Sequence, residues 1–173
     1  MGDSAVWVAA LTGGTAVPAG WVTNRVNARA ARVQAEASAR AQQLTRAREL
    51  RRAAYADFMG QAHANGELYW KADFFLTAGP GVLPTSLDGL RAELRSSYDL
   101  LLHSVRIVAL EGPATAAEAA QAVLEAATRA NRALYRHSVG EADARARFDE
   151  ARQGFTRCLE EFVEVARAAT ETS

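Results

Sequence analysis

The stretch from Asn24 to Leu76 decides the fold, and its sequence is NRVNARAARVQAEASARAQQLTRARELRRAAYADFMGQAHANGELYWKADFFL. Its first half, as far as Leu50, is rich in Ala and Arg, whereas its second half, from Tyr55, adds aromatic residues. Ala, Leu, Arg and Glu are among the best helix formers, so the whole stretch is predicted to form one very long helix. The aromatic half is expected to contribute to a core.

The aromatic half carries apolar residues at the spacing of one helix face. These residues are Tyr55, Phe58, Met59, Ala62, Tyr69, Ala72 and Leu76. Gly60 and Gly66 lie among them, and each costs about 1 kcal/mol relative to Ala in a helix interior. The two glycines therefore indicate either a bend or a close helix crossing.

Three more helices are predicted after a loop rich in Pro and Gly at residues 78–84. The bundle helices are expected at about residues 51–77, 86–111, 114–139 and 141–169. Their apolar stripes are Leu87, Leu90, Leu94, Tyr98, Leu101, Val105 and Val108, then Ala120, Val123, Ala127, Ala130 and Leu134, then Phe148, Ala151, Phe155, Leu159, Phe162 and Ala166. Short connections favour antiparallel neighbours, so the predicted fold is all-α, with the long helix running into an up-down bundle at residues 51–173.

Local signals place the ends of these helices. Ser86 is an N-cap candidate for the second bundle helix. Thr115 followed by Glu118 matches a capping box for the third, and Gly140 is expected to close that helix.

The N-terminal segment, residues 1–22, is predicted to be a membrane anchor. Ala5 to Val22 is an uncharged, mostly apolar run, and as a helix it would be about 27 Å long, enough for the hydrocarbon core of a bilayer. Its anchor features are interfacial tryptophans and small or helix-weakening residues, namely Trp7, Gly13, Gly14, Pro18 and Trp21. No basic residue precedes the run, unlike in a cleaved signal peptide. The alternative is an apolar helix buried in a soluble oligomer.

Charge is distributed unevenly, although the net charge of the chain is zero. Residues 23–52 hold eight arginines against two glutamates, directly after the apolar run. By the positive-inside rule this predicts a single-pass protein with its N-terminus outside and its bundle in the cytoplasm. Arg25, Arg29 and Arg32 are expected to face anionic lipid at the membrane surface.

Residues 23–50 are predicted to be an Ala/Arg-rich helical stalk. Apolar residues recur there at a heptad-like spacing, at Val26, Ala30, Val33, Ala37 and Leu44. Ala buries little area, so the stripe favours weak self-association rather than a tight coiled coil. Nucleic-acid binding by the basic residues is not expected, because no aromatic interleaving or known DNA-binding module accompanies them.

No catalytic, cofactor or metal constellation is predicted. Metal sites in helical bundles use Glu-x-x-His pairs, and Glu does not stand three residues before His63, His103 or His137. Cys158 lies beside an apolar stripe and is expected to be a small core residue. Gly13-Gly14 lacks the Gly-Lys-Ser/Thr of a phosphate loop, so no nucleotide site is predicted there.

One patch mixes aromatic and charged residues in the way that binding surfaces do. It comprises Glu67, Tyr69, Trp70, Lys71 and Asp73, which include the single Lys of the chain and the only Trp beyond the N-terminal segment. We consider it the candidate partner patch, and amphipathic packing at a helix end is the alternative interpretation.

The order of these features resembles a group of uncharacterised actinobacterial membrane-anchored small helical proteins. The resemblance rests on a short N-terminal span, an Ala/Arg/Gln rod, and the sequence RRAAYADF at residues 51–58 that opens a small bundle. It covers about residues 5–60 and a helical tail, and it implies no activity. The anchor and rod are also similar to the peripheral-stalk b subunit of ATP synthase, from which the Pro/Gly loop at 79–84 and the terminal bundle depart.

The leading hypothesis is a non-enzymatic, single-span membrane protein whose cytoplasmic bundle mediates protein–protein interaction or self-assembly. No small-molecule substrate is expected. One alternative is a soluble helical homo-oligomer that uses residues 1–22 as an assembly segment. Another is an enzymatic or small-ligand-binding bundle, which would need an enclosed polar pocket near Trp70 or the histidines.

Overall fold

The computed structural model describes residues 16–78 and 87–171, and these residues form four helices. They are α2 (Ala16–Ala78), α3 (Leu87–Glu111), α4 (Ala114–Ser138) and α5 (Ala144–Glu171). Within the described residues there is no strand, so the prediction of an all-α helical bundle is confirmed. The predicted α5 start at about 141 is too early, because residues 139–143 form the turn.

Much of the predicted membrane anchor lies outside the described residues, including Trp7, Gly13 and Gly14. Pro18 and Trp21 fall within the first turns of α2. Over the ranges 16–78 and 87–171, no helix combines the length and apolarity that a membrane crossing requires.

The chain divides into two compact units, Met1–Arg46 and Ala47–Ser173. In the first unit, Arg29 and residues 31–46 are all exposed. Val33 of the predicted stripe is 67% exposed and Leu44 is 61% exposed. Nothing within the described chain covers these two side chains.

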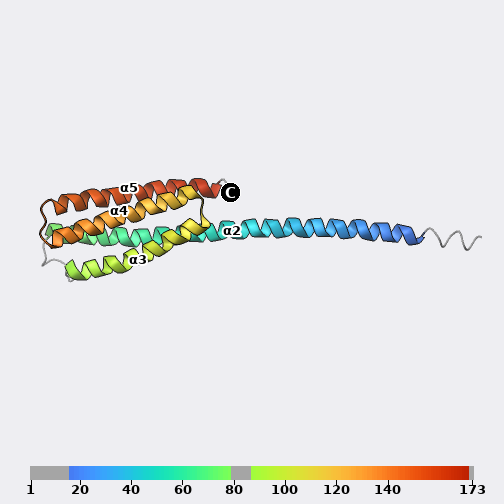
Figure 1. The fold of residues 1–173 in the computed structure, drawn as a ribbon, viewed down its shortest axis with the longest axis horizontal. Helices are drawn as coiled ribbons and strands as arrows, with labels where there is room; N and C mark the ends of the chain where they lie inside the picture. The colour runs from blue at the N-terminus through green and yellow to red at the C-terminus, as the bar shows by residue number, and fades with distance from the viewer. Residues whose placement is uncertain (1–15, 79–86, 172–173) are drawn as a thin grey trace, which may run out of the picture. The chain divides into compact units, whose positions relative to one another are not determined.

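The second unit is an antiparallel up-down bundle formed by the C-terminal part of α2 with α3, α4 and α5 (Figure 1). Its central contact is a ladder of six aromatic rings, which we call the aromatic ladder. Its members are Phe148, Phe155 and Phe162 on α5 and Tyr55, Phe58 and Tyr69 on α2. The phenylalanines recur every seven residues, so they lie on one face of α5, and all six rings are buried.

Neighbouring rings of the ladder meet edge to face or tilted. Phe162 lies 4.3 Å from Phe58 and 5.8 Å from Tyr55 between ring centroids, and the Tyr55 contact is T-shaped. At the other end, the Tyr69 ring lies 5.3 Å from Phe155 and 6.2 Å from Phe148. Such geometries add about 0.5–1.5 kcal/mol per pair beyond the area that they bury.

The other two helices complete the core in different ways. The buried side of α4 is dominated by alanines, Ala116, Ala120, Ala126, Ala127, Ala130 and Ala133. The buried side of α3 is larger and aliphatic, with Leu90, Leu94, Leu101, Val105 and Val108. The small alanine side chains let the α4 backbone approach its neighbours closely. With larger side chains on α4, the bulky rings of α5 would prevent this approach.

Two polar side chains inside the bundle form hydrogen bonds between helices. The Asn65 amide on α2 donates to the backbone oxygen of Ser97 at 3.1 Å and to its hydroxyl at 2.8 Å. The Tyr69 hydroxyl shares its one proton between Ala127 O at 3.1 Å and Asn131 Oδ1 at 3.2 Å. These bonds fix the position of α2 along its axis relative to α3 and α4. A shift along the axis would leave polar groups unpaired at the same depth, which would cost free energy.

Glycines close the ends of α3 and α4. Gly140 has a φ of 76°, a left-handed conformation that suits glycine, and its amide donates to His137 O at 3.0 Å. Glu141 N donates to Arg136 O at 3.0 Å, which completes a Schellman motif. At the other turn, a Cβ on Gly112 would lie 2.9 Å from Val108 O and 3.0 Å from the Tyr55 hydroxyl, so this position has no room for a side chain.

The predicted capping box at the start of α4 is wrong. The N-cap is Pro113, which makes no side-chain capping bond, and Thr115 is already inside the first turn. Pro113 has a φ of −68° and an extended ψ, so the helix begins directly after it, at Ala114, two residues too early for Thr115 to cap it. Ser86 lies outside the described residues.

The α2 helix is continuous through Gly60 and Gly66. A Cβ on Gly60 would meet nothing within 4 Å, whereas one on Gly66 would lie 3.7 Å from the Phe155 ring. Gly66 therefore marks an ordinary close contact with α5. Met59 was expected in the core but is exposed, because the buried face of α2 turns toward Asn65, Leu68 and Phe75 instead.

The aromatic ladder leads to a stability prediction. Phe162→Ala removes a fully buried ring in contact with Tyr55 and Phe58, and we expect a loss of about 3–5 kcal/mol in the free energy of unfolding. Leu110→Ala is the matched control, since Leu110 is 83% exposed and should lose less than about 0.5 kcal/mol. Urea unfolding followed by circular dichroism measures both, and similar losses for the two variants would contradict the assigned core.

Candidate functional site

The structure separates the five residues of the predicted partner patch. Glu67, Trp70 and Lys71 are exposed, with Trp70 at 64%, whereas Asp73 is half-buried. Tyr69 is fully buried and belongs to the aromatic ladder, so its assignment to the surface is corrected. Successive helix residues are rotated by about 100°, so a ring that points into the core places the next side chain at the boundary.

Trp70 is held in place by an arginine on the neighbouring helix. The Arg152 guanidinium carbon lies 4.6 Å from the centroid of the Trp70 ring, within the range of a cation–π contact. Arg152 Nη2 also lies 3.9 Å from Asp73 Oδ2, so one arginine joins the ring to a carboxylate.

A second arginine completes this charged network. Arg145 forms an ion pair with Asp73, and its Nε donates to Asp149 Oδ2 at 3.1 Å. The four charged side chains are each only 20–36% exposed, so their pairing is less screened than that of a surface ion pair. Asp73 thus draws Arg152 to the position from which it covers the Trp70 ring.

A hollow of about 370 Å³ lies beside Trp70, between α2 and α5. Its rim includes His63 and Glu67, whose side chains approach to 3.4 Å, and its floor includes Gly66 and Phe155. We call the exposed residues His63, Glu67, Trp70 and Lys71, together with Arg152, the Trp70 surface. Phe74, four residues after Trp70, is also half exposed and extends the apolar part of this region along α2.

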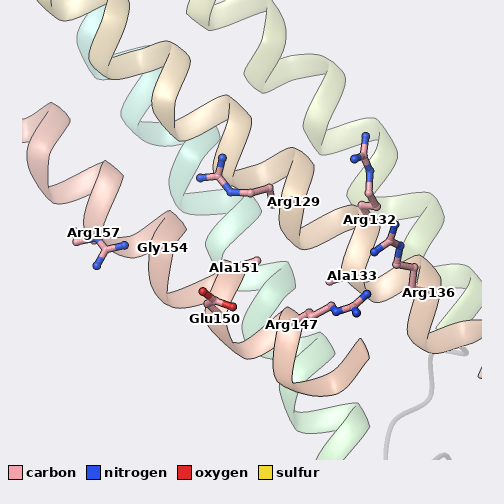
Figure 2. Close-up of a pocket in the computed structure, with 9 residues that line it drawn as sticks. All are labelled: Arg129, Arg132, Ala133, Arg136, Arg147, Glu150, Ala151, Gly154 and Arg157. Carbon is pink, nitrogen blue, oxygen red and sulfur yellow. The ribbon is translucent and has the colours of Figure 1, made fainter. Parts of the chain in front are cut away.

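A second hollow of about 370 Å³ lies between α4 and α5, and we call it the α4/α5 groove (Figure 2). Its lining is strongly basic, with Arg129, Arg132, Arg136, Arg147 and Arg157 against a single carboxylate, Glu150. Ala133, Ala151 and Gly154 complete it. Sequence reasoning missed this groove, although part of the signal was present: the α4 arginines stand at spacings of three and four, and Arg147 and Arg157 share one face of α5.

The remaining predicted residues are scattered. His63 and His103 are exposed, His137 is half-buried, and Cys158 is partly buried against the core. Within the described ranges there is no group of three His, Cys, Asp or Glu side chains placed to hold a metal ion. Of the predicted lipid-facing arginines, Arg29 and Arg32 are exposed.

Comparison with known proteins adds no relative to this description. No protein-family model, curated protein or solved structure matches the chain. The functional argument therefore rests on the geometry of the Trp70 surface and of the α4/α5 groove.

The buried hydroxyl next to the Trp70 surface predicts a pH dependence. Burial raises the pKa of Tyr69 well above its ordinary value, so the folded protein favours the protonated phenol. Stability is therefore complete below about pH 10, where the unfolded tyrosine begins to ionise, and falls as the pH rises toward the folded pKa. Burial also raises the pKa of Tyr55, against the opposing charge of Arg51, so Tyr55 contributes in the same direction.

The Tyr69→Phe variant separates the contribution of Tyr69 to this pH dependence from that of Tyr55. At pH 7.5 we expect the variant to lose about 1 kcal/mol with the two hydrogen bonds of the hydroxyl. Between pH 7.5 and pH 10.5 its stability should fall less than that of the wild type, by about 0.8 kcal/mol, because one ionising group is gone. Urea unfolding at the two pH values measures the difference, and an equal fall in both proteins would contradict the assignment.

Proposed function

We propose that this chain is a non-enzymatic, membrane-anchored helical protein whose bundle binds a protein partner through the Trp70 surface. The observation that carries the proposal is Trp70 itself, a large ring that is 64% exposed yet fixed by Arg152. Trp and Arg are the residue types most enriched among the side chains that dominate binding energy at protein interfaces. A fixed ring also loses little conformational entropy when a partner covers it.

The surroundings of Trp70 support a protein as the ligand. Phe74 adds a second exposed ring one helical turn away, and the neighbouring hollow is large enough for a partner side chain. Lys71 and Glu67 supply charged groups beside the rings. An apolar centre with a polar rim is the usual composition of a protein interface.

Membrane attachment through residues 1–22 is the second part of the proposal. It is supported by the apolar run Ala5 to Val22 and by Arg25, Arg29 and Arg32 directly after it. In this arrangement the N-terminus lies outside the cell, and residues 23–50 connect the anchor to a cytoplasmic bundle.

Self-assembly is the alternative, and the exposed stripe of α2 favours it. Val33 and Leu44 are more than half exposed and lie on one helix face, where a second copy would cover them. In this case residues 1–22 would serve as an assembly segment of a soluble oligomer rather than as a membrane span.

Membrane fractionation distinguishes membrane attachment from self-assembly. We expect the full-length protein to resist carbonate and high-salt washes and to be released by detergent. A variant lacking residues 1–22 should move to the soluble fraction. If the full chain is soluble without detergent and forms a discrete oligomer that is lost in the truncated variant, self-assembly is correct and the anchor is wrong.

Partner binding is tested by Trp70→Ala, with Tyr135→Ala as the matched control. Tyr135 is also an exposed ring covered by an arginine, since the Arg91 guanidinium carbon lies 4.9 Å from its centroid. Each change should cost the fold no more than about 1–2 kcal/mol, the value of one cation–π contact. In-cell crosslinking should give partner adducts with the wild type and Tyr135→Ala that are lost in Trp70→Ala. Adducts that persist in Trp70→Ala would contradict the proposal.

A further inference from the structure

The basic side chains of the α4/α5 groove come from matching faces of two antiparallel helices. Arg129, Arg132 and Arg136 follow one another at spacings of three and four along α4. On α5, Arg147 and Arg157 flank Glu150 and Gly154 at similar spacings. Because the helices are antiparallel, Arg129 and Arg157 lie toward one end of the groove, and Arg136 and Arg147 lie toward the other (Figure 2).

Neutralisation of these arginines is incomplete. Arg136 Nε lies 3.4 Å from Glu141 Oε2, and Arg147 Nη1 lies 3.1 Å from Glu141 Oε1, so one carboxylate serves both. The side chains of Arg129, Arg132 and Arg157 form no ion pair or hydrogen bond with any described residue. Like charges held on facing helices repel one another, and a bound anion would offset that repulsion.

The side chains that form the floor of the groove are small. Ala133 and Ala151 contribute only methyl groups, and Gly154 contributes none. A Cβ on Gly154 would meet nothing within 4 Å, so alanine would fit there without any steric cost. Glycine in a helix interior is less stable than alanine. Its presence therefore gives space to the groove at the expense of the helix.

We propose that the α4/α5 groove binds a small, multiply charged anion of the phosphate class through these arginines. The guanidinium group donates two parallel hydrogen bonds that match the oxygens of a phosphate, and its charge persists at every physiological pH. The hollow of about 370 Å³ has the size of a small-ligand site. Glu150 in the lining and the zero net charge of the chain favour a compact anion over a long polyanion.

The phosphate group could belong to a soluble phosphorylated compound or to the head group of an anionic phospholipid. Both sources present the same chemistry to the arginines. This inference is independent of the Trp70 surface, because its lining residues are different and Arg152 is not among them.

The test uses inorganic pyrophosphate as the probe and the full-length protein in an uncharged detergent. Isothermal titration calorimetry at low salt should show saturable binding to the wild type. Arg129→Gln/Arg157→Gln removes two unpaired charges and should weaken binding at least tenfold. Arg40→Gln/Arg106→Gln is the matched control, because both side chains are exposed and form no ion pair with the described part of the chain. It should change the affinity less than twofold.

Gly154→Leu tests the groove without changing charge. The added side chain should occupy the open space above position 154 and weaken pyrophosphate binding at least fivefold, with no loss in Tm. No saturable binding to the wild type would overturn the proposal, as would equal weakening in the two double variants. Wild-type affinity in a folded Gly154→Leu variant would also overturn it.

Competition identifies the source of the phosphate. Short-chain phosphatidic acid that displaces pyrophosphate at a much lower concentration than glycerol 3-phosphate, which has the same phosphate and no acyl chains, would support a lipid head group. Pyrophosphate binding that resists phosphatidic acid would support a soluble phosphorylated compound. Equal displacement by short-chain diacylglycerol would contradict the proposal, because that lipid carries acyl chains and no phosphate.

Discussion

The bundle depends on the contact between α5 and the second half of α2, where six buried aromatic rings pack in two groups of three. Phe148, Phe155 and Phe162 repeat every seven residues, so they keep one face of α5 turned toward α2 along its length. Rings this large fill the space between two helices, so the third helix that packs on them must present small side chains. The alanine face of α4 meets that requirement.

The packing of large rings beside small alanines also shapes the surface of the bundle. Where α4 and α5 meet, both helices contribute small residues, Ala133, Ala151 and Gly154, and the long side chains stand at the flanks. The flanking side chains are arginines on both helices, so the same packing that lets α4 approach α5 leaves a shallow hollow with basic walls. The α4/α5 groove thus follows from a core with large rings on one pair of helices and alanines on the next.

Periodicity predicted the helices and most of the core well, because apolar residues at spacings of three and four leave few alternatives. It failed where the face of a helix had to be chosen. On α2, Met59 and Tyr69 both fitted an apolar stripe broad enough to include them, and only packing decides that Tyr69 is inside and Met59 outside. Asn65 was missed because its burial depends on Ser97, a residue on another helix.

The sequence places most of the candidate partner patch at the surface, but it does not show which residue orients Trp70. Glu67, Trp70 and Lys71 adjoin in sequence and lie on the surface, but the residue that fixes Trp70 is Arg152, far away in the chain. No spacing rule joins these two, since their contact exists only once the aromatic ladder has set the rotation of α5. The groove arginines were visible as local spacings, yet their meaning required the knowledge that α4 and α5 face each other.

One helix therefore serves two surfaces. Arg145 and Arg152 lie on one flank of the α5 phenylalanines and bind Asp73 beside Trp70, whereas Arg147 and Gly154 lie on the other flank in the groove. Because a helix is stiff, any rotation of α5 about its axis would move both flanks together. The aromatic ladder opposes that rotation, since each buried ring would lose its partners. The geometry of both surfaces is thus set by a core contact that belongs to neither.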